Sequence, residues 1–158
     1  MSSARKLRDS DYWLVRQVVD ERREYLQNSK RKSWYKYLDT DACMSFIYAC
    51  ENAYVVDDAF LVVYEITNPA YAQKHILFVE EVMVLRLVPG SSFDAVTAFF
   101  DEVRERVGAV GIFAGTALAK SDRALARLYS RAGYRTETFI MTKEAPGGFI
   151  EQGGEGSG

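Results

Sequence analysis

Apolar residues recur with a roughly helical period over residues 11–26, and a second helix is expected to begin at Thr40 or Asp41 and to run to Ala49 and beyond. The first segment follows Ser10, whose side chain is of a type that caps helices. The next two segments, Ala53–Val56 and Phe60–Ile66, are instead rich in β-branched and aromatic residues, and a short acidic turn separates them. This change of pattern predicts two helices followed by a β-hairpin.

In the second half of the chain, strand-like and helix-like patterns alternate. Residues 75–87 are almost continuously apolar, as expected of a strand that is buried on both faces. A stripe of apolar residues then predicts a helix over 93–107, and residues 109–117 have the composition of another buried strand. A further helix is expected to end at Gly133, and a last strand is expected over residues 134–143.

These elements together predict one α/β domain, with a mixed and mostly antiparallel sheet flanked by helices on both faces. A short strand at Ala4–Leu7 completes the expected set. The chain has 158 residues, of which 48% are hydrophobic, and this length suits a single core. We expect the domain to cover residues 1–144, and a flexible tail rich in glycine to cover residues 145–158.

The composition narrows the chemistry that is open to this protein. Two cysteines exclude a disulfide framework and a four-thiolate zinc site, and the single histidine, His75, excludes a two-histidine metal motif. We therefore expect no metal site. No apolar run approaches the ~20 residues of a membrane span, so we expect a soluble cytoplasmic protein without a membrane partner. Residues 1–36 carry a net charge of +5 and the remainder −7, an asymmetry that could steer an anionic ligand.

The turn between residues 75–87 and the helix that follows is a candidate anion site. At the N-terminus of a helix, the first backbone N–H groups have no partner within the helix and point outward. The residues expected at this position are Gly90, Ser91, Ser92 and Phe93. The helix dipole favours negative charge at that place, so a pyrophosphate would fit. An ordinary capped helix is the alternative interpretation.

Residues 121–134 resemble a motif of the GCN5-related N-acetyltransferases, the GNAT superfamily. In that family a late helix commonly has the sequence Asn-x-x-Ala-x-x-Leu-Tyr-x-x-x-Gly-Phe. The residues of this chain in the same register are Asp122, Leu125, Leu128, Tyr129, Gly133 and Tyr134. The resemblance is clearest in the Leu-Tyr-x-x-x-Gly-aromatic core, whereas Asp122 and Leu125 stand where the family has Asn and Ala.

An earlier segment, residues 79–84, resembles the strand that precedes the cofactor loop of the same family. The loop itself departs from the family pattern, because Arg86, Pro89 and Ser92 stand where Pro, Arg and Gly are usual. Pro89 also lacks an N–H group to offer to a phosphate. The resemblance implies an acetyl-CoA-dependent N-acyltransferase, which transfers the acetyl group directly to an amine of a small molecule or a protein.

The resemblance also implies roles for particular residues. Those expected to contact acetyl-CoA are Met83, Val84 and Leu85, through the main chain of their strand, together with Gly90, Ser91, Ser92, Phe93 and Asp122. Tyr129 matches the general acid, although a plain core residue is the alternative. Glu80 is the first choice of general base and Glu81 the second. Because neighbouring strand residues point to opposite faces, only one glutamate is expected to face the site, and a structural ion pair is the alternative for either.

The basic and aromatic segment 30–37 lies between the first two predicted helices. In GNAT proteins this loop usually borders the acceptor site, so Trp34 and Tyr35 are the expected contacts to the amine acceptor. A solvated loop with anchoring aromatic residues is the alternative interpretation. We do not expect a nucleic-acid partner, although basic and aromatic residues together could stack on bases.

A second function stays open at this point. Because the cofactor loop is altered, the chain could be a catalytically degenerate GNAT-like protein that acts by protein–protein binding, for example as a phage or accessory-system effector. The two functions differ in their response to acetyl-CoA, which the enzyme must bind. GNAT proteins are often dimers, so the resemblance is also compatible with a homodimer.

Overall fold

The computed structural model describes residues 3–146 of the chain. The strands are β1 (Ala4–Lys6), β2 (Ala53–Val56), β3 (Phe60–Thr67), β4 (Phe78–Arg86) and β5 (Gly111–Phe113). The helices are α1 (Tyr12–Ser29), α2 (Thr40–Ala49), α3 (Asp94–Val107) and α4 (Asp122–Arg131), with short 3-10 turns η1 (Asp9–Asp11) and η2 (Ser33–Tyr37). Apart from its first two positions, the predicted tail lies outside the described residues.

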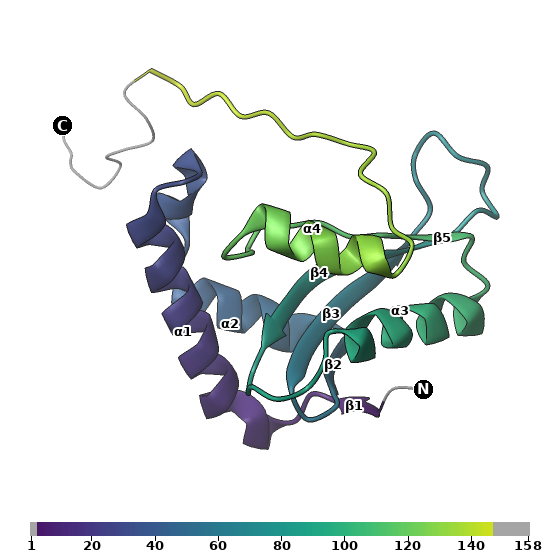
Figure 1. Ribbon diagram of the computed structural model, residues 1–158, viewed down its shortest axis with the longest axis horizontal. Helices are drawn as coiled ribbons and strands as arrows, with labels where there is room; N and C mark the ends of the chain where they lie inside the picture. The colour runs from purple at the N-terminus through teal and green to yellow at the C-terminus, as the bar shows by residue number, and fades with distance from the viewer. Residues whose placement is uncertain (1–2, 147–158) are drawn as a thin grey trace.

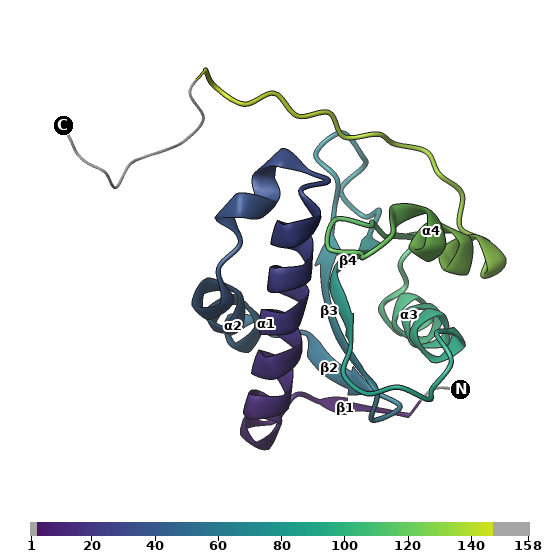
Figure 2. The ribbon, with the colours of Figure 1, turned by 60° about the vertical axis from the view of Figure 1, so that its left-hand side comes forward.

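The five strands form one sheet in the order β1-β2-β3-β4-β5 (Figure 1). Neighbouring strands from β1 to β4 are antiparallel, whereas β5 runs parallel to β4. Figure 2 shows α1 and α2 on one face of the sheet and α3 and α4 on the other. The predicted α/β architecture, a mixed and mostly antiparallel sheet with helices on both faces, is confirmed.

The helices bury the two faces of the sheet in two separate hydrophobic cores. One core lies beneath α3 and α4 and includes Phe100 of α3 and Val62 of β3. The other lies beneath α1 and α2 and includes Val15 of α1 and Leu61 of β3. Consecutive residues of β3 thus point into different cores, which explains why the sequence of this strand is apolar along most of its length.

Two predicted strands differ from the structure. The strand expected over 109–117 is limited to β5, because this segment pairs with β4 only at Phe78–Glu80 and then leaves the sheet. The strand expected over 134–143 is wrong, since this segment is extended but pairs with no strand of the described part of the chain. A strand is held by ladder hydrogen bonds to a neighbour, so a favourable composition is not sufficient without a partner.

A β-bulge changes the direction of the side chains half-way along β4. The register between β3 and β4 shifts next to Val63, and Val82 of β4 is left without a residue opposite to it. Before the bulge, Val79 faces the core beneath α3 and α4, and Glu81 shares that face by the period of the strand. After the bulge, Met83 faces the core beneath α1 and α2. The bulge therefore places Glu81 and Met83 on opposite faces.

The start of β5 packs closely against β4. Phe78 lies opposite Gly111 in the register, and the ring of Phe78 stacks on the ring of Phe113 with centroids 4.2 Å apart. A Cβ atom on Gly111 would lie 2.7 Å from Cε2 of Phe78, well inside van der Waals contact. Glycine is therefore the residue that lets the stacked rings lie over the strand.

Gly111→Ala should destabilise the domain by about 1–2 kcal/mol, because the added methyl group displaces the stacked rings. Urea unfolding followed by circular dichroism measures this loss. Gly115→Ala is the matched control, since a Cβ atom there meets nothing within 4 Å, and it should cause no comparable loss. Equal losses in the two variants would contradict the close-packing explanation.

Candidate active site

Strand β4 has an open edge where its pairing with β5 ends. β3 pairs with β4 from Phe78 to Arg86, whereas β5 pairs only with Phe78–Glu80. Beyond Glu80, the edge of β4 that faces away from β3 has no strand neighbour among residues 3–146. Main-chain N–H and C=O groups at such an edge are available to a ligand.

Val84 is the residue whose main chain faces this opening. Leu87 donates its N–H to the carbonyl oxygen of Ala59 at 2.6 Å, which is on the β3 side. Main-chain groups of a strand alternate between its two edges, so Leu85 and Met83 also face β3, and Val84 faces the opening. Of the three residues expected to contact a pantetheine arm, Val84 is the one with this orientation.

Glu81 lies beside the opening, where the strand ladder ends. Its Oε1 accepts the N–H of Gly115 at 2.9 Å, so the carboxylate binds the main chain of the segment that leaves β5. Burial raises the pKa of Glu81 to about 7, while the N–H of Gly115 opposes the shift and the charge of Glu80 adds to it. A carboxyl group with a pKa near neutrality can both gain and lose a proton at physiological pH.

Tyr129 of α4 is buried in the core on the same face of the sheet as Glu81. Its ring packs edge-on against Phe93 at 5.2 Å and lies 4.8 Å from the ring of Tyr134, measured between centroids. Within the described residues, the buried hydroxyl groups of Tyr129 and Tyr134 have no hydrogen-bond partner. Burial strongly raises the pKa of Tyr129, and the charge of Glu81 raises it further. Both tyrosines are therefore neutral O–H groups whose hydrogens are available to a ligand.

The two candidate glutamates face opposite sides of the sheet, as expected for neighbours in a strand. Glu80 is exposed and lies opposite Glu65 of β3 in the register. Glu81 shares its face with Val79, and α3 and α4 cover that face. The structure therefore brings the second choice, Glu81, close to Tyr129, and leaves the first choice, Glu80, on the other side.

The loop between β4 and α3 contains a glycine in a left-handed backbone conformation. Gly90 has a φ of +113°, which residues with a Cβ atom rarely adopt. Arg86 supports the loop, because its Nη1 donates to the carbonyl oxygen of Ser91 at 2.7 Å. The guanidinium group of Arg86 also lies over the ring of Phe60, 4.5 Å from the centroid. Arg86, one of the three residues that depart from the family pattern, thus holds the loop in place.

Four main-chain N–H groups just before α3 are available to a ligand. α3 begins at Asp94, and the hydroxyl oxygen of Ser92 accepts the N–H of Asp94 at 3.1 Å. In the part of the chain that the structure describes, the N–H groups of Gly90, Ser91, Ser92 and Phe93 donate to no protein acceptor. The side chain of Phe93 is buried, so only its main chain can meet a ligand. The N-terminus of a helix of this length favours an anion.

The segment 30–37 packs against the loop that leads to α4. Tyr35 is buried, and its hydroxyl group donates to the carbonyl oxygen of Ala117 at 3.0 Å. Trp34 is half-buried and packs edge-on against Tyr35, with centroids 4.8 Å apart. In this structure the hydroxyl group of Tyr35 holds the loop that leads to α4. Contacts of Trp34 and Tyr35 with an amine acceptor stay a prediction.

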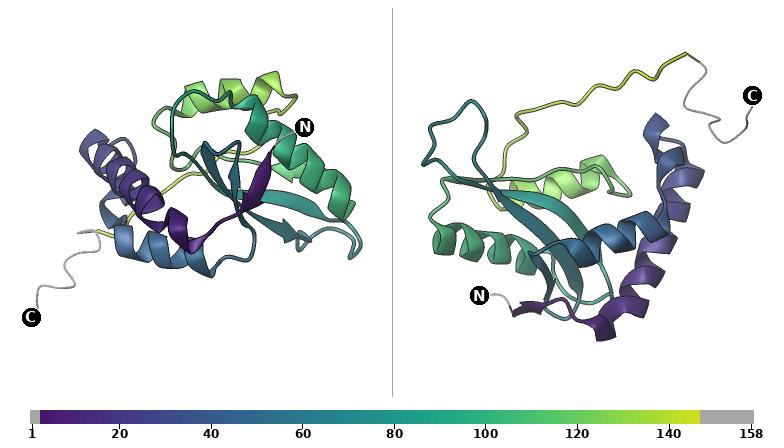
Figure 3. Two further views of the ribbon diagram at one scale, coloured as in Figure 1. Left: turned by 90° about the horizontal axis from the view of Figure 1, so that it is seen from below. Right: turned by 180° about the vertical axis from the view of Figure 1, so that it is seen from behind.

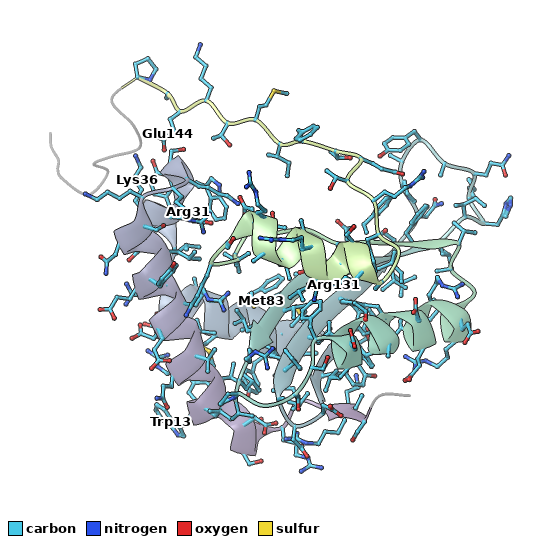
Figure 4. All side chains as sticks on the ribbon, viewed as in Figure 1. Trp13, Arg31, Lys36, Met83, Arg131 and Glu144 are labelled. Carbon is cyan, nitrogen blue, oxygen red and sulfur yellow. The ribbon has the colours of Figure 1, made fainter. Side chains whose placement is uncertain are left out.

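Asp122, at the start of α4, is engaged in ion pairs. Its carboxylate lies 3.1 Å from Nζ of Lys32 and 3.8 Å from Nη1 of Arg31. Arg31, labelled in Figure 4, also donates to the carbonyl oxygen of Ala119 at 2.7 Å. These contacts join α4 to the segment that follows α1. They engage the carboxylate of Asp122, which the motif assigns to contact with the cofactor.

Two groups beside Glu81 were not expected from the sequence. Gly115 supplies an N–H group to a carboxylate that lies 34 positions away in the chain, and no local pattern indicates such a contact. Tyr134 contributes a second hydroxyl group that has no partner between residues 3 and 146. The sequence feature that could have indicated Tyr134 is its position in the motif, as the aromatic residue after Gly133.

Solved structures with the same fold include several acetyltransferases. A possible acetyltransferase from Clostridium difficile 630 matches with a TM-score of 0.60 and 13% identity, over 92% of this chain and 98% of that chain. An aminoglycoside acetyltransferase from an uncultured soil metagenomic sample matches with a TM-score of 0.56 and 12% identity, over 92% of this chain and 99% of that chain. An aminoglycoside N-acetyltransferase in complex with CoA matches with a TM-score of 0.50 and 13% identity, over 91% of this chain and 95% of that chain.

No protein-family model matches the sequence, and a comparison with curated proteins finds no match. The structural matches nevertheless extend over nearly the whole of each chain. This chain therefore has the fold of the GNAT N-acetyltransferases, and the resemblance found in the sequence is confirmed at the level of the fold. Among the residues that the structure describes, no helix is both long and apolar enough to cross a membrane.

Glu81→Gln should stabilise the domain at neutral and alkaline pH. The pKa of Glu81 in the folded state, about 7, lies above its ordinary value of 4.5, so the carboxyl group ionises first in the unfolded chain. The stability that this group contributes is therefore fully present below about pH 4.5 and is lost as the pH rises through about 7. The loss amounts to at most about 3 kcal/mol, and glutamine, which does not ionise, avoids it.

Urea unfolding between about pH 4 and about pH 8 measures this difference. The two proteins should be similar at the acidic end and diverge as the pH rises. Glu80→Gln makes the same change of charge at the exposed neighbouring position and should follow the wild type. Parallel curves for the wild type and Glu81→Gln would contradict the ionisation of a buried carboxyl group.

Proposed function

We propose that this protein transfers an acetyl group from acetyl-CoA to an amine of a small molecule or a protein. The observation that carries the proposal is the opening between β4 and β5, beside which lie the main chain of Val84, the carboxyl group of Glu81 and, in the core on the Glu81 face, the hydroxyl group of Tyr129. Matched solved structures support it, since they include acetyltransferases and one of them holds CoA.

The residues of this chain fit acetyl-CoA at two places. The N–H groups of Gly90, Ser91, Ser92 and Phe93 offer donors for the pyrophosphate, and the guanidinium group of Arg86 adds positive charge beside them. The N–H of Val84 offers a donor for the acyl carbonyl oxygen, whose negative charge increases during the reaction. When bound, acetyl-CoA supplies a thioester carbonyl group that an amine can attack.

Glu81 takes the proton of the attacking amine and returns it to the leaving group. With a pKa of about 7, the carboxyl group of Glu81 is partly ionised at neutral pH. An ordinary thiol has a pKa of about 8.5, so protonated Glu81 is acidic enough to protonate the leaving sulfur. In the complete reaction a C–N bond forms, the C–S bond breaks, and the proton of the amine ends on the sulfur.

Tyr129 donates a hydrogen bond to the sulfur and keeps its proton. The family resemblance assigned a general-acid role to this residue, but burial raises the pKa of Tyr129 far above that of a thiol. Complete proton transfer from Tyr129 to the sulfur is therefore unfavourable. Because its hydroxyl hydrogen has no partner among the described residues, it can stabilise the negative charge that develops on the sulfur.

Isothermal titration calorimetry should show that acetyl-CoA binds the wild-type protein. Gly90→Ala should weaken this binding, because a Cβ atom disfavours the φ of +113° that orients the loop. Gly108→Ala is the control: Gly108 has a φ of +72° at the opposite end of α3, so the variant should lose stability and keep its affinity. No heat at millimolar acetyl-CoA would overturn the proposal and favour the alternative of a GNAT-like binding protein.

Glu81→Gln should slow acetyl transfer about 100-fold or more, and the fall of kcat/KM below about pH 7 should disappear with it. Tyr129→Phe should lower kcat while the Kd for acetyl-CoA stays unchanged. Thiol release from acetyl-CoA, measured over a panel of amines, gives these rates. Glu80→Gln is the matched control and should retain the rate of the wild type. Loss of activity in Glu80→Gln alone would instead assign the proton transfer to Glu80.

A further inference from the structure

A small pocket lies on the face of the sheet that α1 and α2 cover. The left view of Figure 3 shows these two helices, in purple and blue, on one side of the strands and α3 and α4, in green, on the other. The pocket has an empty volume of about 320 Å³ with its mouth included, near the lower end of the range for small-molecule sites. Its apolar wall is formed by Val19, Leu26, Leu38, Cys43, Leu85 and Leu118.

The pocket adjoins the opening between β4 and β5. Leu85, from β4, is the neighbour of Val84, whose main chain faces the opening. Leu118 lies in the loop that continues from Gly115, and Gly115 binds Glu81 where the strand ladder ends. The pocket therefore has walls from both sides of the opening, so a small molecule bound in it lies next to the main chain of Val84.

Arg22, which lines the pocket from α1, is a half-buried cation. Its Nη1 donates to the carbonyl oxygen of Leu118 at 2.7 Å, and within residues 3–146 the guanidinium group forms no ion pair with a carboxylate. Burial lowers the pKa of Arg22, and only Tyr25 and Tyr35 oppose this shift. A guanidinium group carries five N–H donors, so most of those of Arg22 remain available to a ligand. An anion bound here would offset the solvation that the cation loses on folding.

The other charged side chains that line the pocket already have partners. Arg23 pairs with the carboxylate of Asp20 at 2.9 Å. Asp39 accepts the N–H of Ala42 at 2.8 Å, as the N-cap of α2. The charge at the pocket that lacks a partner in the described part of the chain is therefore the positive charge of Arg22.

We propose that the acceptor is a free amino acid with an apolar side chain, whose carboxylate binds Arg22 and whose side chain lies in the pocket. This inference rests on the proposed acetyl transfer and names its acceptor. Nε and Nη2 of Arg22 can donate in parallel to the two carboxylate oxygens, while Nη1 keeps its bond to Leu118. The apolar wall favours an apolar side chain over a polar one. In the reaction the C–N bond of an N-acetyl amino acid forms, the C–S bond of acetyl-CoA breaks, and the amine proton ends on the sulfur.

Thiol release from acetyl-CoA, with L-leucine and with leucinamide as acceptors, tests the role of the carboxylate. The wild type should have a kcat/KM for leucine about 10-fold or more above that for leucinamide. Leucinamide loses its ammonium proton more readily, so the chemistry of the amine alone favours the opposite order. Arg22→Gln should abolish the preference, because glutamine has an N–H donor for the carbonyl oxygen of Leu118 but no charge.

Arg31→Gln is the matched control. Arg31 donates to the carbonyl oxygen of Ala119 at 2.7 Å, next to the acceptor of Arg22, but it does not line the pocket. A loosened loop should change the rates with both acceptors by the same factor, so Arg31→Gln should keep the preference for leucine. A wild type without this preference, or an equal loss of it in both variants, would overturn the proposal.

Cys43→Phe tests the apolar wall, because the larger side chain fills space in the pocket. It should lower kcat/KM for leucine about 10-fold and leave that for glycine nearly unchanged. Cys43→Ala, which fills no space, is its control and should retain the selectivity of the wild type. Equal effects of Cys43→Phe on leucine and glycine would contradict the placement of the side chain.

Calorimetry with isocaproate, which is leucine without its amino group, tests the pocket without acetyl-CoA. Isocaproate should bind the wild type, and it should bind Arg22→Gln at least about 10-fold more weakly. Acetylation of simple amines together with no binding of isocaproate would overturn this inference and leave the proposed function in place. Binding of isocaproate without acetylation of any amine would instead overturn the proposed function and retain Arg22 as a carboxylate site.

Discussion

Three ladder positions, Phe78–Glu80 opposite Gly111–Phe113, hold β5 to β4, and beyond them the two strands separate. This separation is the constraint on which the other features of the site depend. The close packing of Phe78 over Gly111 permits the pairing, and the bond from the N–H of Gly115 to Glu81 takes over where the ladder ends. Because β5 does not extend along the rest of β4, no strand among residues 3–146 pairs with the main-chain groups of Val84 on this edge.

The groups beside this opening are unfavourable for stability. Glu81 loses solvation on folding, and the hydrogen bond from the N–H of Gly115 compensates only in part. The pKa of Glu81 therefore rises toward neutrality. Tyr129 and Tyr134 bury hydroxyl groups that have no partner among the described residues. Each such group carries a cost of desolvation that an apolar residue would avoid. Buried polar groups with a desolvation cost are concentrated in functional sites, because a ligand can complete their interactions there. This is the physical reason to regard the opening between β4 and β5 as the candidate active site.

The basic first quarter of the chain has a structural role that its net charge conceals. Arg22 and Arg31 donate to carbonyl oxygens of Leu118 and Ala119, in the loop between β5 and α4, and Lys32 pairs with the carboxylate of Asp122. These donors satisfy main-chain groups that a chain leaving a sheet would expose. The positive charge thus fixes α4, and with it Tyr129, relative to the sheet.

Local patterns in the sequence determined the hairpin of β2 and β3 and the presence of α2 and α4. The cap of α4, where the hydroxyl oxygen of Ser121 accepts the N–H of Ala124, is likewise a local contact. The motif around Tyr129 was sufficient to indicate the fold, because helix stripes and caps depend on residues close together in the chain. Only the tertiary structure decided which glutamate lies on the same face of the sheet as Tyr129, since the bulge at Val82 reverses the alternation that a regular strand would keep. The burial of Tyr35 was likewise decided at long range, because it depends on the distant loop that carries Ala117. The same holds for residues 135–143, which find no partner strand in the part of the chain that the structure describes.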